Sequence, residues 1–190
     1  MNTIEDITNF IFVGKKMDEL SHYDLLIINA DWAEEQLAKD IRIMFDRNII
    51  DKDTLFIICE SHRNHDGSID DRSTANILID CLKKENINNK IIIDDKYISN
   101  PEILKNIDKL VNIKDYTRIL RIAKDFVARR WYMNAREHNF PIEKCDFYGA
   151  VDGRNISKND WYKSEVGVNQ VMKEFINIGN LTIDGELSIK

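Results

Sequence analysis

The sequence predicts an α/β fold in which a mostly parallel sheet of about five strands lies between layers of helices. Short apolar runs such as Leu55–Cys59 and Ile91–Ile93 alternate along the chain with longer segments of helical periodicity. Runs of this kind, without polar alternation, are typical of strands buried on both faces of a parallel sheet. Because parallel strands need crossover connections, the intervening helices cover both faces. The predicted architecture is therefore a Rossmann-like three-layer αβα sandwich.

Five strands are expected, and their order along the chain is Leu25–Ile28, Leu55–Cys59, Ile91–Ile93, Arg118–Ala123 and Asp146–Val151. The fourth run is less apolar than the others because two arginines interrupt it. Turn-forming and acidic residues follow most of these runs, which is typical of strand ends.

Helices are expected between the strands, where apolar residues recur every three or four positions. Ser73 or Asp71 is expected to cap the helix after the second strand, and Pro101 suits the first turn of the next one. Gly14 is expected to end a short opening helix in the left-handed conformation. The last helix is expected to run from about Asn159 to a stop at Gly179-Asn180, with a tail hairpin or edge strand over residues 180–187.

The composition is that of one soluble domain spanning residues 1–190, with 43% hydrophobic and 32% charged residues. A net charge of −6 argues against bulk nucleic-acid binding. No apolar run approaches the ~20 residues that span a bilayer, and the start of the chain lacks a basic signal region, so we expect a cytoplasmic protein. Cys59, Cys81 and Cys145 form no CxxC pair and are expected to be buried, reduced thiols.

The most polar stretch, from Glu60 to Gly67, begins directly after the second strand. In open α/β sheets, ligands bind in the crevice outside the carboxyl ends of the strands, so we expect a site there. Ser61 is a candidate ligand contact in this loop. Glu60 and His65 are the candidate acid–base residues, because a partly buried carboxylate or imidazole can titrate near neutral pH.

Other strand exits carry side chains that could hold the hydroxyl groups of a ribose or a sugar. Asn29 and Asp31 follow the first strand, and Asp95 follows the third. Carboxylate and amide oxygens accept hydrogen bonds from hydroxyls. The alternative is that these residues only cap helices and end strands, which Asp and Asn also do.

A cluster of cations follows the fourth strand, where Lys124 precedes a helix that begins near Arg129 and Arg130. Cations at a helix start oppose the helix dipole, and an anion bound between them and the backbone N–H groups would remove that cost. The three residues are therefore candidate anion contacts. The alternative is that one arginine pairs with Asp125 or with an acid of a neighbouring loop.

A metal site is not expected. His62, His65 and Asp66, with Glu60 nearby, could converge on a cation, but they match no known zinc spacing. A polar loop exposed to solvent, in which one histidine hydrogen-bonds the backbone, is the better explanation for them. The chain also lacks GxGxxG, Walker A and GxSxG sequences, which argues against a dinucleotide cradle and an ordinary hydrolase nucleophile.

Several of these segments resemble, in the same order, features of one bacterial family. They are the loop ending in His65, the Arg72–Ala75 step into a helix, the Asn86–Asp95 turn and strand, and the Lys124–Arg130 segment. On these residues the chain resembles the YdcF-like family over nearly its whole length. It departs from the family where Glu60-Ser61 replaces two glycines and Thr74 replaces a glutamate.

The resemblance implies a Rossmann-like fold and, for some members, a nucleotide-like ligand such as S-adenosylmethionine. Other members are linked to envelope polysaccharide or peptidoglycan metabolism. We therefore expect a protein that binds a small anionic or nucleotide-like ligand. The alternatives are a transferase or hydrolase acting on a phosphorylated or sugar substrate, and a degenerate module that binds a partner without catalysis.

Overall fold

A computed structural model of the chain describes residues 3–30, 33–60, 73–95, 100–150 and 153–187. The strands of these ranges form one sheet and are β1 (Leu25–Asn29), β2 (Leu55–Cys59), β3 (Ile91–Asp94), β4 (Ile119–Lys124) and β5 (Cys145–Ala150). Their order in the sheet is β3-β2-β1-β4-β5, and every neighbouring pair is parallel. The predicted fold class is confirmed.

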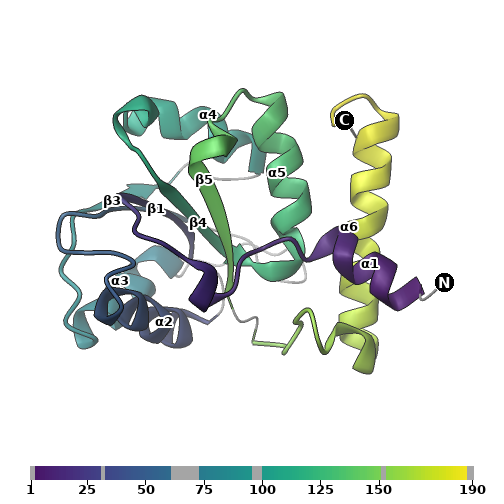
Figure 1. Ribbon diagram of the computed structural model, residues 1–190, viewed down its shortest axis with the longest axis horizontal. Helices are drawn as coiled ribbons and strands as arrows, with labels where there is room; N and C mark the ends of the chain where they lie inside the picture. The colour runs from purple at the N-terminus through teal and green to yellow at the C-terminus, as the bar shows by residue number, and fades with distance from the viewer. Residues whose placement is uncertain (1–2, 31–32, 61–72, 96–99, 151–152, 188–190) are drawn as a thin grey trace.

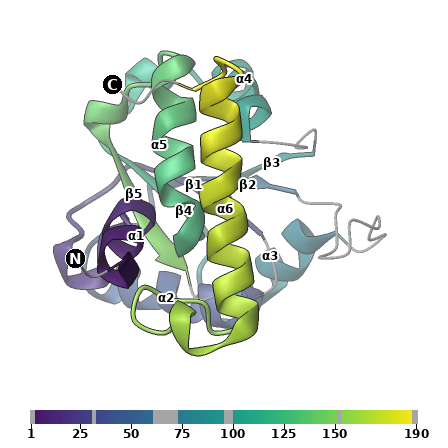
Figure 2. The ribbon, with the colours of Figure 1, turned by 90° about the vertical axis from the view of Figure 1, so that its right-hand side faces the viewer.

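The helices of the described ranges lie in layers around this sheet. They are α1 (Thr3–Ile11), α2 (Glu34–Asp46), α3 (Thr74–Lys84), α4 (Asn100–Leu110), α5 (Ala128–Glu137) and α6 (Glu165–Ile183). In Figure 1, α2 and α3 cover one face of the sheet, and α4 and α5 cover the other. Helices α1 and α6 lie outside α5, as Figure 2 also shows, around a third apolar cluster.

Alternate residues of each strand supply the two main apolar cores. Leu26 and Ile28 belong to the core under α2 and α3, whereas Leu25 and Ile27 belong to the core under α4 and α5. All four side chains are fully buried. Successive side chains of a strand point to opposite faces, so a strand covered on both sides must be apolar at every position. This explains the unbroken apolar runs in the sequence.

Three helices end on an asparagine in the left-handed conformation, at Asn48, Asn86 and Asn139, with φ of 55°, 59° and 54°. After each one, an apolar residue is buried and donates its N–H to the carbonyl five residues earlier, at 2.9, 2.9 and 2.8 Å for Ile49, Ile87 and Phe140. This is the Schellman arrangement, in which glycine is the usual residue. Asparagine in this role helps to explain how a chain with seven glycines ends its helices.

Replacing Asn86 with alanine is expected to lower the free energy of unfolding by about 1 kcal/mol, because a Cβ without a polar side chain disfavours positive φ. Replacing it with glycine is expected to cause no loss. Denaturant unfolding of the two variants measures the difference. Asn86 is exposed, so an equal loss in both variants would contradict the conformational explanation.

Three expectations about glycines and the chain's end are wrong. Gly14 is not left-handed, and it lies against Phe147 in a segment that bridges to β5 at Lys15 and Tyr148. Helix α6 begins at Glu165, after a short 3-10 turn, and continues through Gly179-Asn180 to Ile183. Within the described residues, the tail therefore forms no strand.

The stop of α6 lies at Gly185, whose φ is 75°. The N–H of Glu186 donates to the carbonyl of Leu181 at 2.8 Å, which completes a Schellman motif. Leu187 is buried in the third apolar cluster, against which Leu181 packs. Either Gly179 or Gly185 could end a helix. The helix ends at Gly185, where the turn lets Leu187 pack into the cluster beside Leu181.

The three cysteines are buried and unpaired, as predicted. Burial raises the pKa of the Cys59 thiol to about 12, which keeps it protonated at neutral pH. Among the described residues, no helix has the length and apolar character needed to cross a bilayer.

Candidate functional site

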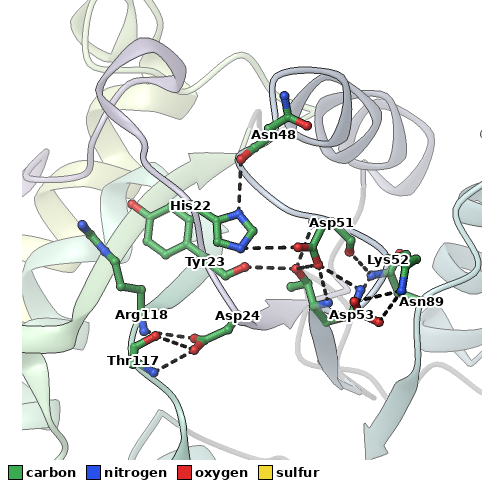
Figure 3. A network of polar contacts seen from close by, with 11 residues as sticks. His22, Tyr23, Asp24, Asn48, Asp51, Lys52, Asp53, Asn89, Thr117 and Arg118 are labelled. Carbon is green, nitrogen blue, oxygen red and sulfur yellow. Dashed lines mark hydrogen bonds and ion pairs between the residues drawn. The ribbon is translucent and has the colours of Figure 1, made fainter.

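The polar side chains at the amino edge of the sheet are satisfied by one another. The Asp24 carboxylate accepts hydrogen bonds from the N–H and hydroxyl of Thr117, at 2.8 and 2.7 Å, and from the N–H of Arg118 at 3.0 Å. Asn89 donates its amide to the carbonyls of Asp51 and Thr54, at 2.6 and 2.9 Å. Figure 3 shows this network, which joins the loops before β1, β2, β3 and β4.

Asp146, at the start of β5, belongs to the same network of polar contacts at the amino edge of the sheet. Its carboxylate accepts from Lys15 Nζ at 2.7 Å, Tyr23 Oη at 2.6 Å and Arg118 Nη2 at 2.8 Å. Burial alone would raise the pKa of Asp146, but these donors hold it below its usual value. The polar contacts at the amino edge therefore hold the loops and strands together, and the main charged groups there already have partners.

The carboxyl edge differs, beginning with its topology. The first strand lies in the middle of the sheet, and the chain runs outward from it to β2 and β3 on one side and to β4 and β5 on the other. The carboxyl ends of β1 and β4 are therefore the topological switch point, where connections leave in opposite directions. Ligands of open α/β sheets bind at this crevice.

Polar side chains from several strands meet at this edge on the face covered by α4 and α5. We name Asp94, Asn29, Arg121 and Asp125 the carboxyl-edge row. Each of the first three follows, by two positions, a residue that packs on that face, namely Ile92, Ile27 and Ile119. Asp125 lies against Gly149, which follows Phe147 of the same core by two positions. The strand order brings these residues together from distant parts of the chain.

Arg121 is fully buried within β4. Its guanidinium donates from Nη1 to the carbonyl of Ile27 at 3.1 Å and from Nη2 to Asn29 Oδ1 at 2.6 Å. Its Nε has no hydrogen-bond partner, and no ion pair joins it to a carboxylate of the described residues. An isolated buried charge costs several kcal/mol in the low-dielectric interior. Within the described part of the chain, the guanidinium therefore has only uncharged partners at hydrogen-bond distance, namely two oxygens and the thiol of Cys59.

The bond to Arg121 sets the orientation of the Asn29 amide. A guanidinium is only a donor, so the amide oxygen must face it and the amide nitrogen must point the other way. Asn29 is half-buried, and none of the described groups accepts a hydrogen bond from Nδ2. Asn29 therefore presents two N–H donors at the switch point, with the charge of Arg121 behind them.

Asp125 follows β4 directly and opens the short 3-10 turn Asp125–Val127. Burial raises the pKa of its carboxyl group to about 6, and the positive charge of Lys158 opposes that rise. Its carboxylate accepts no hydrogen bond from the described residues. A carboxyl group with a pKa near neutrality at a strand exit is a common feature of binding and catalytic sites.

Glu60, a candidate acid–base residue, is only 3% exposed and faces the start of α3. It accepts from Ser73 Oγ at 2.8 Å, Thr74 Oγ1 at 3.1 Å and the N–H of Ala75 at 3.4 Å. Ser73 is the N-cap of α3, as one of the two predictions had it, and its Oγ accepts from the N–H of Asn76 at 3.2 Å. Glu60 therefore stabilises a helix start, and Thr74 supplies one of its donors.

The two candidate anion-binding arginines contact other helices. Arg130 pairs with Glu174 of α6, with Nε to Oε1 at 2.5 Å and Nη2 to Oε2 at 3.2 Å. Arg129 donates from Nε to the carbonyl of Phe10 at 2.8 Å and lies over that ring. These contacts join α5 to α6 and α1, so both side chains have structural partners. The sequence left open that one arginine pairs with Asp125 or with an acid of a neighbouring loop. Arg130 does pair with an acid, but that acid is Glu174 of α6.

The remaining candidates are placed as follows. Lys124 is the last residue of β4 and is half-buried. Asp95 follows β3 and is exposed, two strands away from β1. Asp31, Ser61, His62, His65 and Asp66 lie outside the described residues. Within the described ranges, no group of three or more His, Cys, Asp or Glu residues is arranged to hold a metal ion.

A surface hollow of about 730 Å³ opens between α2 and α3, on the other face of the sheet. Its lining carries both signs of charge, with Glu34, Glu35 and Asp80 beside Lys39 and Lys84. It contains no member of the carboxyl-edge row. We therefore place the candidate site at the row rather than in this hollow.

Comparison of the chain with protein-family models, curated proteins and solved structures finds no match. The resemblance to the YdcF-like family stays a prediction.

Sequence reasoning missed Arg121 and Asp125 as site residues. The signal for Arg121 was present, because an arginine interrupts the otherwise apolar Ile119–Ala123 run of a central strand. A charge in a strand buried on both faces requires a partner or a function. Asp125 carried the same signal as Asp31 and Asp95, an acid just after a strand, but it was considered only as a partner for an arginine.

Proposed function

We propose that the protein binds a small anionic or nucleotide-like ligand at the carboxyl edge of its sheet, and S-adenosylmethionine is one ligand of this class. The observation that carries the proposal is the buried guanidinium of Arg121, which lacks a carboxylate partner among the described residues. An anionic group held nearby would compensate this charge, and Asn29 would supply the direct hydrogen bonds.

The contrast between the two edges of the sheet supports this location. At the amino edge the acids and bases neutralise one another, as at Asp146 with Lys15 and Arg118. At the carboxyl edge, Arg121 and Asp125 remain without opposite-charge contacts at hydrogen-bond distance within the described part of the chain. A fold that leaves such groups unpaired at a switch point is expected to pair them with a ligand.

Replacing Asn29 with alanine is expected to weaken ligand binding about tenfold or more, because it removes hydrogen bonds to a charged or strongly polar group. The protein would first be screened by thermal shift against nucleotides, S-adenosylmethionine, nucleotide sugars, inorganic phosphates and divalent metals. Any compound that raises the melting temperature would then be titrated calorimetrically into wild type and variant. At a hundredfold its dissociation constant, a ligand stabilises the native state by about 2.7 kcal/mol.

The matched control is Asn106→Ala, which removes an asparagine from α4 far from the carboxyl-edge row. This variant is expected to bind as wild type does. If Asn29→Ala binds every stabilising compound as tightly as wild type, the site is elsewhere. If no compound stabilises the wild type, the proposal fails and a partner-binding module becomes the better explanation.

A transferase or hydrolase acting on a phosphorylated or sugar substrate is the second candidate, and the carboxyl group of Asp125 favours it. With a pKa near 6, this group can both take and give a proton close to neutral pH. Glu60 is a weaker acid–base candidate, because its oxygens already accept hydrogen bonds from the start of α3. Turnover of a bound compound that is lost in Asp125→Asn would establish this reading.

A further inference from the structure

We infer that Asp125 accepts the hydroxyl groups of a ribose, and that the ligand is a ribonucleotide whose phosphate lies at Asn29. This inference rests on the proposed function and narrows its ligand class. It assigns a binding role to Asp125, which lies outside the anion contact. Asp125 would accept hydrogen bonds from the ligand, whereas the amide of Asn29 would donate them.

The first support is the way the backbone accommodates the Asp125 carboxylate. A Cβ at Gly149 would lie 2.4 Å from Asp125 Oδ1, and a Cβ at Gly14 would lie 3.1 Å from it. The two glycines come from β5 and from the segment that bridges to β5, far apart in the sequence. A side chain at Gly149 would displace the Asp125 carboxylate, and one at Gly14 would crowd it. The two glycines therefore leave room for this group.

The second support is the position of Asp125 relative to the anion contact. Ile28 is paired with Ile122, so Asn29 ends β1 beside the end of β4. Asp125 follows β4 directly, so both residues lie at the carboxyl edge of neighbouring strands. This arrangement suits a ligand with an acceptor group at one end and donors at the other, such as a ribose 5′-phosphate.

The third support is chemical complementarity. An ionised carboxylate can only accept hydrogen bonds, so it repels a phosphate and selects a group that carries donors. Adjacent hydroxyls of a ribose supply two such donors, as they do for an acidic residue of dinucleotide-binding sheets. The titratable groups whose fields reach Asp125 are Lys158 and Tyr148. Neither donates a hydrogen bond to it, so no described residue uses its acceptor positions.

The test compares adenosine monophosphate with its 2′,3′-dideoxy analogue, which keeps the base and phosphate but lacks both hydroxyls. Each would be titrated calorimetrically at pH 7.5 into wild type, Asp125→Ala and the control Asp80→Asn, which changes an exposed acid on α3. Wild type and control are expected to bind adenosine monophosphate at least tenfold more tightly than the analogue. In Asp125→Ala the preference is expected to fall below threefold, with binding of the analogue retained. Circular dichroism would establish that each variant is folded.

If Asp125→Ala misfolds, Asp125→Asn replaces it. This variant keeps the shape but accepts through a single neutral oxygen, and an intermediate preference is expected. A preference that survives in the folded Asp125 variants would overturn the inference, and so would equal binding of the two nucleotides by wild type. If wild type binds neither nucleotide but binds inorganic pyrophosphate in a manner that Asn29→Ala weakens, the ribose assignment is wrong while the proposed anion site stands. If it binds none of the three, the ribonucleotide inference is wrong, and the proposed function is then decided by the thermal-shift screen of the other ligands.

Discussion

Replacing Asp125 with asparagine is expected to stabilise the protein at neutral pH, by about 2–3 kcal/mol above pH 7. Burial raises the pKa of this carboxyl group from its ordinary 3.8 to about 6. The folded state therefore binds the proton more tightly than the unfolded chain does. That contribution to stability is fully present below pH 3.8 and is lost as the pH rises through about 6. Asparagine is neutral throughout and does not lose it.

The difference between variant and wild type should accordingly be near zero below pH 4 and grow to its full size above pH 7. Urea unfolding at intervals from pH 4 to pH 8 would measure this profile. Asp80→Asn, which changes an exposed acid, serves as the control and is expected to show no comparable rise. A stability difference that does not depend on pH would mean that Asp125 is solvated in the folded protein.

A gain of this kind would also bear on function. Proteins commonly give up stability at binding and catalytic sites, where a desolvated charge is useful. A substitution that stabilises the free protein and weakens a ligand therefore distinguishes a functional carboxylate from a structural one. Loss of stability in Asp125→Asn would instead indicate a structural role.

Replacing Arg130 with methionine is expected to have the opposite effect, a loss of about 3–5 kcal/mol. Its partner Glu174 is only 2% exposed and would be left as a buried carboxylate without this cation. The double variant Arg130→Met with Glu174→Leu removes both charges and is expected to recover most of the loss, because apolar packing can replace a buried ion pair. Thermal and urea unfolding of the three proteins measure the coupling.

The control for the second prediction is Arg42→Met, which breaks the solvent-exposed ion pair with Asp46 on α2. Little change is expected there, since exposed pairs contribute little. Stability close to wild type in Arg130→Met would mean that the pair is not structural and that Arg130 is again a candidate for ligand contact. The two arginines thus have different predicted roles: Arg130 joins α5 to α6, and Arg121 is the proposed charge for an anion.

Local features of the sequence were enough to predict the sheet and its class. Apolar runs at Leu25–Ile28 and Leu55–Cys59 predicted strands buried on both faces, and the structure has them with every neighbour parallel. The helix after the second strand begins at the predicted cap, Ser73. These features depend on the residues a few positions away, whose spacing and backbone preferences are visible in the sequence.

The outcome for the site was different, because its contacts join residues far apart in the chain. The interpretation of Arg129 and Arg130 as anion contacts followed from their place at a helix start, whereas Glu174, more than forty residues later, is the partner of Arg130. The contact of Arg121 with Asn29 exists only because β4 lies beside β1. The order of strands is not encoded by any local pattern, so these pairings could not be predicted from it.

By itself, therefore, the sequence determined that this protein has an α/β sheet with polar residues at its strand exits. Only the tertiary structure decided which of those residues have partners within the fold and which have none among the described residues. The physical reason is that burial and pairing are properties of neighbours in space. Glu60 finds donors at the start of α3, whereas Asp125, a residue of the same chemistry, lies against two glycines and finds no donor among the described residues.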